Sequence, residues 1–173
     1  MKKFLVFAVM AAMVLFTGCK KTPEFNKALT EDYASVIAEY PEARLYEVQT
    51  EFNDEFTTRD RNGLHIVTAR EIYQVDPQHI FEVVRNFEDG TCAKSLYEGF
   101  WTGDVVMTLD GLHNINEALD ALFKSDIIVP ETNLMTLRNP LVAVLYPNAF
   151  YIFGSTKTSF VAVDGVTLEV QEF

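Results

Sequence analysis

The stretch Arg44-Leu-Tyr-Glu-Val-Gln-Thr-Glu-Phe52 decides the fold class, because its apolar and polar side chains alternate with a period of two. That period is typical of a strand, whose successive side chains point to opposite faces of a sheet. Tyr46, Val48 and Phe52 are expected on one face. Glu47, Gln49 and Glu51 are expected on the other. The stretch therefore predicts a strand that is buried on one side only.

A helix is predicted immediately before this strand. Its apolar residues recur at the spacing of one helix face: Tyr33, Val36, Ile37 and Tyr40. Thr30 is expected to open the helix, because acidic residues follow it in the first turn, where the helix dipole favours them. Pro41 is expected to end it.

More strands are predicted after Phe52, at about Leu64–Val75 and His79–Phe87. Asp89-Gly90 is a two-residue hairpin signal that leads into a fourth strand near Thr91. The segments Tyr97–Trp101 and Val105–Leu109 are expected to extend the same sheet. A helix followed by an antiparallel meander is the predicted order.

The order then repeats. Asn114 can cap a second helix, and Glu117 stands at the capping-box position. Five short strands separated by turn residues are predicted after Pro130: Leu134–Arg138, Val142–Tyr146, Phe150–Phe153, Ser159–Asp164 and Thr167–Gln171. The expected fold is α+β with two packed halves, residues 28–110 and 111–173, each a helix on an antiparallel meander.

The second half resembles the PepSY domain in two places. Asn114–Leu122 is similar to the helix that opens that domain, and Val163-Asp-Gly-Val-Thr-Leu-Glu-Val170 is similar to its closing hairpin, V-D-x-x-T-G-E-V. Leu168 stands where the family has glycine. The first half, through Tyr40–Val48, looks like a more diverged relative. The resemblance implies two cystatin-like halves and a non-enzymatic role in protease inhibition or partner binding, although the Gln-x-Val-x-Gly signature of true cystatins is absent.

The N-terminus resembles a bacterial lipoprotein signal. Lys2 and Lys3 precede the apolar run Phe4–Phe16, and Leu15-Phe-Thr-Gly-Cys19 is similar to a lipobox. The run is shorter than the roughly 20 residues that span a bilayer. We expect residues 1–18 to be removed, Cys19 to carry the lipid and residues 19–29 to form a tether. Lys20 after the cysteine favours the outer membrane.

Charge and composition narrow the classes of partner. The formal net charge of −11 argues against nucleic acid and anionic lipid headgroups and favours neutral or basic partners. Fourteen Phe and seven Tyr residues suit a protein rich in strands. With Cys19 committed to lipid, Cys92 is the other cysteine, and we expect it to be a buried apolar residue on a strand.

The sequence shows no recognisable catalytic or metal-binding motif. His65, His79 and His113 are isolated from one another, no phosphate-binding or dinucleotide glycine loop is present, and no cofactor is expected. The candidate binding residues are instead aromatic. Tyr97, Phe100 and Trp101 are flanked by glycines, and Tyr and Trp are favoured anchors in protein interfaces.

The leading hypothesis is therefore a membrane-anchored envelope lipoprotein that acts as a non-catalytic protein-binding or inhibitor-like module, with an envelope protein or peptide as its partner. Two alternatives remain open: an envelope protein that binds a small molecule between helix and sheet, and an enzyme with an unrecognised site.

Overall fold

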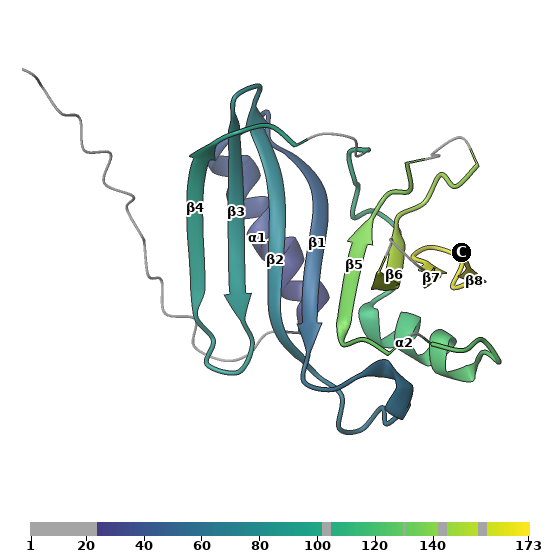
Figure 1. Cartoon of the computed structure of the whole chain (residues 1–173). Coiled ribbons are helices and arrows are strands. Elements are labelled where there is room, and N and C mark those ends of the chain that lie inside the picture. Colours follow the sequence, from purple (N-terminus) through teal and green to yellow (C-terminus); the bar gives the residue numbers. More distant parts are fainter. Residues whose placement is uncertain (1–23, 102–104, 130, 142–144, 156–158) are drawn as a thin grey trace, which may run out of the picture.

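The structure, a computed structural model, describes residues 24–101, 105–129, 131–141, 145–155 and 159–173. Its main feature is one antiparallel sheet with the strand order β4-β3-β2-β1-β5-β6-β7-β8 (Figure 1). The first four strands are β1 (Arg44–Phe52), β2 (Ile66–Asp76), β3 (His79–Asn86) and β4 (Cys92–Glu98). The others are β5 (Leu134–Arg138), β6 (Phe150–Ser155), β7 (Ser159–Asp164) and β8 (Val170–Glu172). The helices are α1 (Phe25–Glu39) and α2 (Ile115–Lys124), with a 3₁₀ turn at Phe56–Thr58.

The strand that decides the fold class lies in the interior of the sheet. β1 pairs with β2 along one side and with β5 along the other. The pairing with β5 runs without a register shift from Glu47 opposite Arg138 to Glu51 opposite Leu134. The Thr50 hydroxyl also donates to the carbonyl oxygen of Met135 at 3.1 Å. The sheet is therefore continuous across the middle of the chain.

This continuity corrects the predicted fold class. The structure does not have two cystatin-like or PepSY-like halves, each a helix on its own meander. Over the described residues it is mainly β, one eight-stranded sheet with two helices. A single buried cluster contains residues from both ends of the chain, among them Val48, Leu119 and Phe153. The physical reason is that an alternating strand pattern fixes which face is buried but not which strand lies alongside. The sequence patterns of β1 and β5 therefore do not predict that these two strands pair.

Both helices cover the same face of the sheet, which we call the inner face. α1 crosses behind the first four strands (Figure 1). Tyr33 on α1 contacts Tyr73 on β2, with 6.4 Å between ring centroids, and Tyr40, directly after the helix, contacts Phe81 on β3 at 5.2 Å. The apolar side of α2 is buried in the same cluster against residues of β6 and β7. The opposite face of the sheet, the outer face, carries neither helix.

The first helix begins earlier than predicted. It starts at Phe25 rather than Thr30, and Phe25, Ala28 and Leu29 are buried. Residues 25–29, assigned to the tether from the sequence, are therefore the first helical turns. Burial of this apolar side outweighs the N-cap signal at Thr30, whose hydroxyl donates instead to the carbonyl oxygen of Asn26 at 2.8 Å. Residues 19–23 of the predicted tether, Cys19 among them, lie outside the described residues.

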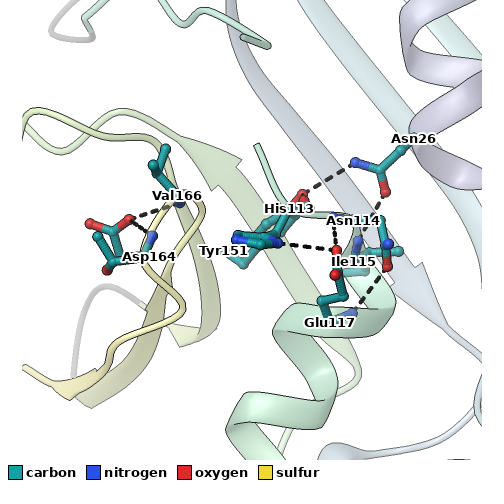
Figure 2. A network of polar contacts seen from close by, with 9 residues as sticks. Asn26, His113, Asn114, Ile115, Glu117, Tyr151, Asp164 and Val166 are labelled. Carbon is teal, nitrogen blue, oxygen red and sulfur yellow. Dashed lines mark hydrogen bonds and ion pairs between the residues drawn. The ribbon is translucent and has the colours of Figure 1, made fainter. Parts of the chain in front are cut away.

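A polar joint ties the start of α1 to the start of α2 and to β6 (Figure 2). The Asn26 side chain accepts a hydrogen bond from the Ile115 backbone N–H at 2.9 Å and donates one to the Tyr151 hydroxyl at 3.3 Å. That hydroxyl donates to the His113 carbonyl at 2.6 Å. Asn114 and Glu117 form the predicted capping box, with bonds of 3.1 and 3.0 Å. The helices are thus held together by side-chain bonds as well as by the core.

The closing hairpin is organised by Asp164. Its carboxylate accepts from the backbone N–H groups of Val166 at 2.8 Å and Thr167 at 2.9 Å. A Cβ at Gly165 would lie 2.7 Å from the Ala149 carbonyl oxygen, so glycine is required there. Leu168 has a φ of 62°, a left-handed conformation that glycine adopts more readily. The residue that differs from the PepSY hairpin therefore occupies a backbone conformation that favours glycine.

Three further segments differ from the sequence predictions. In β1 a bulge between Leu45 and Glu47 turns Leu45, rather than Tyr46, toward the core. β4 ends at Glu98, and within Val105–Leu109 Val105 makes only an isolated bridge to Asn139. Val142–Tyr146 lies partly outside the described residues, and its described part is not a strand. Cys92 is buried on β4, as predicted.

Candidate binding surface on the outer face of the sheet

The outer face is built by the side chains that alternate with the core residues of each strand. On β2, for example, Glu71 and Tyr73 point into the core, whereas Arg70 and Gln74 point to the outer face. Two groups of residues stand out on this face. A row of polar side chains crosses the middle strands, and an aromatic groove lies over the last four.

The polar row begins with Tyr97 on β4 and Arg70 on β2, which both donate to the same carboxylate oxygen of Glu82 on β3. Arg70 also donates to the amide oxygen of Gln49 on β1 at 3.2 Å. The shared carboxylate raises the pKa of the Arg70 guanidinium, so its positive charge is fixed. Partial burial, followed by the bond to Glu82, raises the pKa of Tyr97, so its hydroxyl stays protonated.

The row continues onto the second half of the sheet. The Gln49 amide donates to Glu47 at 2.6 Å, and the guanidinium of Arg138 on β5 lies 3.5 Å from the same carboxylate. Ile72 on β2 lies between Glu47 on β1 and Glu82 on β3 in the register of the sheet. The side chains of the row cover it, and it is fully buried. These contacts link five adjacent strands by side chains alone. The row is therefore a fixed pattern of charge rather than a set of independent mobile groups.

The aromatic groove starts where the polar row ends, at Arg138. It has a volume of about 530 Å³. Phe150 contacts Tyr146 at 5.5 Å between ring centroids, and Phe160 stacks on Phe173 at 5.1 Å. The remaining lining residues are Pro140, Leu141 and Ile152. Leu141 is 59 % exposed and Phe173 is 41 % exposed, so the groove presents apolar surface to solvent.

The three aromatic residues predicted as binding candidates lie at the β4 end of the sheet, with β1, β2 and β3 between them and the groove. Tyr97 is on the outer face and belongs to the polar row. Phe100, 68 % exposed, follows the end of β4 and lines a shallow hollow with His79 and Glu98. Trp101 is half-buried, and its backbone N–H donates to the Gln74 side chain at 2.6 Å. They are close in sequence, but only Tyr97 contributes to the polar row.

The groove was missed from the sequence, although its strands were predicted. Phe150-Tyr-Ile-Phe153 is apolar at every position, so it shows no alternation from which an outer face could be read. Tyr151 and Phe153 fill the core, while Phe150 and Ile152 form a separate small cluster on the other side. A strand segment that is apolar at every position was the available signal.

A second group of ionisable residues is buried under α1. Arg85 on β3 donates to both carboxylate oxygens of Asp32 on α1, with distances of 2.7 to 2.9 Å. Nearby, the Tyr73 hydroxyl donates to Glu71 at 2.5 Å. Burial raises the pKa of the Glu71 carboxyl well above its usual range. These residues are at most 5 % exposed, so the cluster positions α1 and has no access for a substrate.

The histidines are separated from one another. His79 contacts Asp76, His65 contacts Glu88, and His113 contacts Glu117. Within the described ranges, no group of three or more His, Cys, Asp or Glu residues could hold a metal ion. A smaller pocket of about 230 Å³ lies between the starts of the two helices and the sheet, lined mainly by apolar residues such as Phe52 and Leu119.

No helix in the described part of the chain is both long and apolar enough to cross a membrane. Neither a family model nor a curated protein matches the sequence. The fold is similar to a crystal structure from Clostridium difficile 630 whose protein is described as "a putative lipoprotein". The match has a TM-score of 0.52 and 13 % sequence identity, and covers 84 % of this chain and 92 % of the other. The two chains share a fold.

Proposed function

We propose that the protein is a lipid-anchored envelope protein that binds another protein through the outer face of its sheet, without catalysis. The observation that carries the proposal is the aromatic groove next to the polar row, on the face that neither helix covers. Interfaces of this kind combine buried aromatic anchors with a polar surround.

The partner we propose is a neutral or basic protein that inserts an apolar side chain into the groove. The net charge of −11 disfavours an acidic partner. The groove is hollowed enough to take side chains, and its rings pack edge to face or stacked, which leaves apolar walls for an inserted group. The polar row supplies charges of both signs in fixed positions, which favours binding of one complementary partner over nonspecific association.

The proposed lipid anchor is inferred from the N-terminal sequence. The lipobox-like Leu15–Cys19 supports lipidation at Cys19, and the fold likeness to a protein described as a lipoprotein is consistent with it. The outer membrane is the membrane we propose, from Lys20. Cys19→Ala is expected to move the protein from the membrane fraction to the soluble fraction. Membership of the PepSY family remains a hypothesis that rests on the hairpin and helix motifs.

The test compares two substitutions that place a charge on exposed apolar residues. Leu141 lines the groove and is 59 % exposed, whereas Ile128 is 85 % exposed and does not line it. A partner captured from envelope extract by the wild type should bind the Leu141→Asp variant at least about tenfold more weakly, because a carboxylate cannot be buried there unpaired. The Ile128→Asp variant should bind normally. Equal affinity for both variants would exclude the groove.

A small molecule is the second candidate, because a volume of 530 Å³ lies within the range of roughly 300 to 1,000 Å³ that is typical of ligand pockets. Native mass spectrometry of the purified protein separates the two candidates. An adduct of a few hundred daltons that the Leu141→Asp variant loses would favour the small molecule. Its absence, together with a captured protein, would favour the protein partner.

A further inference from the structure

β4 forms one edge of the sheet and pairs only with β3. Within the described residues, no strand pairs with its other side. Natural proteins usually protect such an edge by a very short strand, a proline, a bulge or a charged side chain such as lysine. β4 carries Lys94, which disfavours a strand that would leave this charge unpaired. β4 has seven residues and no proline, and its register with β3 runs without a shift. It is therefore an open template for another strand.

The backbone groups that face this open edge can be identified from the ladder. The N–H of Asn86 donates to the Thr91 carbonyl at 2.9 Å, and the N–H of Gly99 donates to the Gln78 carbonyl at 2.7 Å. Odd-numbered residues of this stretch therefore direct their backbone groups toward β3. Since the direction alternates along an antiparallel strand, Lys94, Leu96 and Glu98 direct theirs toward the open edge.

We propose that β4 pairs antiparallel with β4 of a second copy of this chain, with Leu96 on the two-fold axis. Leu96, 48 % exposed, then lies opposite Leu96 of the partner subunit. Lys94 lies opposite Glu98 of the partner subunit, and the symmetry repeats this pair on the other side of the axis. Two ion pairs flank an apolar contact, and about six backbone hydrogen bonds close the ladder.

The charges of Lys94 and Glu98 favour the register with the two-fold axis at Leu96 over registers with the axis at another residue of β4. A two-fold axis at Lys94 would place two lysines opposite each other, and an axis at Ser95 would place Lys94 opposite Leu96. Only the axis at Leu96 gives opposite charges at the hydrogen-bonded positions. Because each copy has a net charge of −11, association needs such local complementarity to offset the overall repulsion.

The helices leave room for this pairing. α1 is centred on β3: Tyr33 contacts Tyr73 on β2, Asp32 binds Arg85 on β3, and Ser35 accepts a hydrogen bond from Lys94 on β4 at 3.0 Å. The α1 helices of the two copies would be separated by about three strand spacings, or about 14 Å, which is more than the 8 to 10 Å of packed helices. The inner faces would lie on the same side of the combined sheet. The two outer faces would then form one continuous surface.

Disulfide cross-linking of the full-length chain in bacterial membranes tests the register. The background variant is Cys92→Ala, which removes the buried thiol. In the proposed dimer the two Cα atoms at position 96 are about 5.5 Å apart, within reach of a disulfide, so Leu96→Cys should give a covalent dimer on oxidation. Ala93 is also exposed on β4 but would lie about 20 Å from its copy. Ala93→Cys should therefore give no more dimer than the Cys92→Ala background.

A charge reversal tests the ion pairs with the same readout. Lys94→Glu, added to Leu96→Cys, should lower the yield of dimer by about tenfold, because both pairs become repulsive. Adding Glu98→Lys should restore the yield, which a merely unfolded variant would not do. Equal cross-linking at positions 93 and 96, no cross-linking at 96, or no restoration by the double reversal would each overturn the proposal.

Discussion

Protonation of the Glu71 side chain makes the stability of the folded core depend on pH. The residue is 3 % exposed, and burial raises the pKa of its carboxyl well above the ordinary value of 4.5, although the hydrogen bond from the Tyr73 hydroxyl opposes part of that shift. The folded chain therefore keeps this proton at pH values at which the unfolded chain has released it. Stability from this group is complete below about pH 4.5 and is lost as the pH rises through the folded-state pKa.

Replacing Glu71 with Gln removes the titration and keeps the shape. The free energy of unfolding of the wild type should fall relative to that of Glu71→Gln as the pH rises above about 4.5. Urea unfolding between pH 4 and 8 measures the difference. Glu51→Gln, an exposed carboxylate on β1, is the matched control and should run parallel to the wild type. A constant difference for Glu71→Gln across that range would show that the carboxyl is already ionised in the folded protein.

Substitutions of Leu168 test whether backbone conformation or side-chain hydrophobicity has the larger effect on stability at this turn. At a φ of 62° a β-branched side chain is strained, whereas asparagine is tolerated. Leu168→Val should therefore destabilise the protein by about 1 to 2 kcal/mol more than Leu168→Asn, although valine is the more apolar residue. Denaturant unfolding of the two variants gives the order. The reverse order would mean that side-chain packing, not φ, dominates at this turn.

For the individual elements, the sequence pattern located most strands but not their neighbours. The predicted bounds of β1, β5 and β7 agree with the structure, because turn residues and alternation mark them. The start of α2 is also where the capping box placed it. The pairing of β1 with β5 was not predictable, since register between distant strands is decided by the packing of the whole core.

The candidate binding surface, too, could be predicted from the sequence only in part. Tyr97 was identified because an aromatic residue beside glycines is a recognisable signal. The polar row around it depends on Glu82, Arg70 and Gln49, three residues from three strands that meet only after folding. The groove depends on which side of β6 faces the core, and an entirely apolar strand does not reveal that.

The shared core makes a prediction for α2. Leu119 is 1 % exposed and belongs to the same cluster as Val48 on β1. Leu119→Ala should cost about 2 to 5 kcal/mol through lost burial and the cavity that remains. Because the sheet is continuous, calorimetry should show a single transition that moves as a whole. Two separate transitions, with only one displaced by the substitution, would contradict a common core.

On the scale of the whole molecule, the sheet separates two sides of different composition. The inner side, with both helices and the buried cluster of Asp32 and Arg85, holds the fold together. The outer side carries the polar row and the groove and is left open to solvent. If the proposed function holds, a substitution at an exposed position of the groove should weaken partner binding without altering the melting temperature.

The most direct measurement of the central claim is a photo-cross-linking scan in intact cells. A benzophenone side chain is placed at the exposed outer-face positions Leu134, Leu141 and Phe173, and at the exposed helix positions Ala34 and Asp120. The proposed function predicts one and the same protein adduct from the outer-face positions and none from the helices. Adducts from Ala34 or Asp120 alone, with none from the outer face, would contradict it.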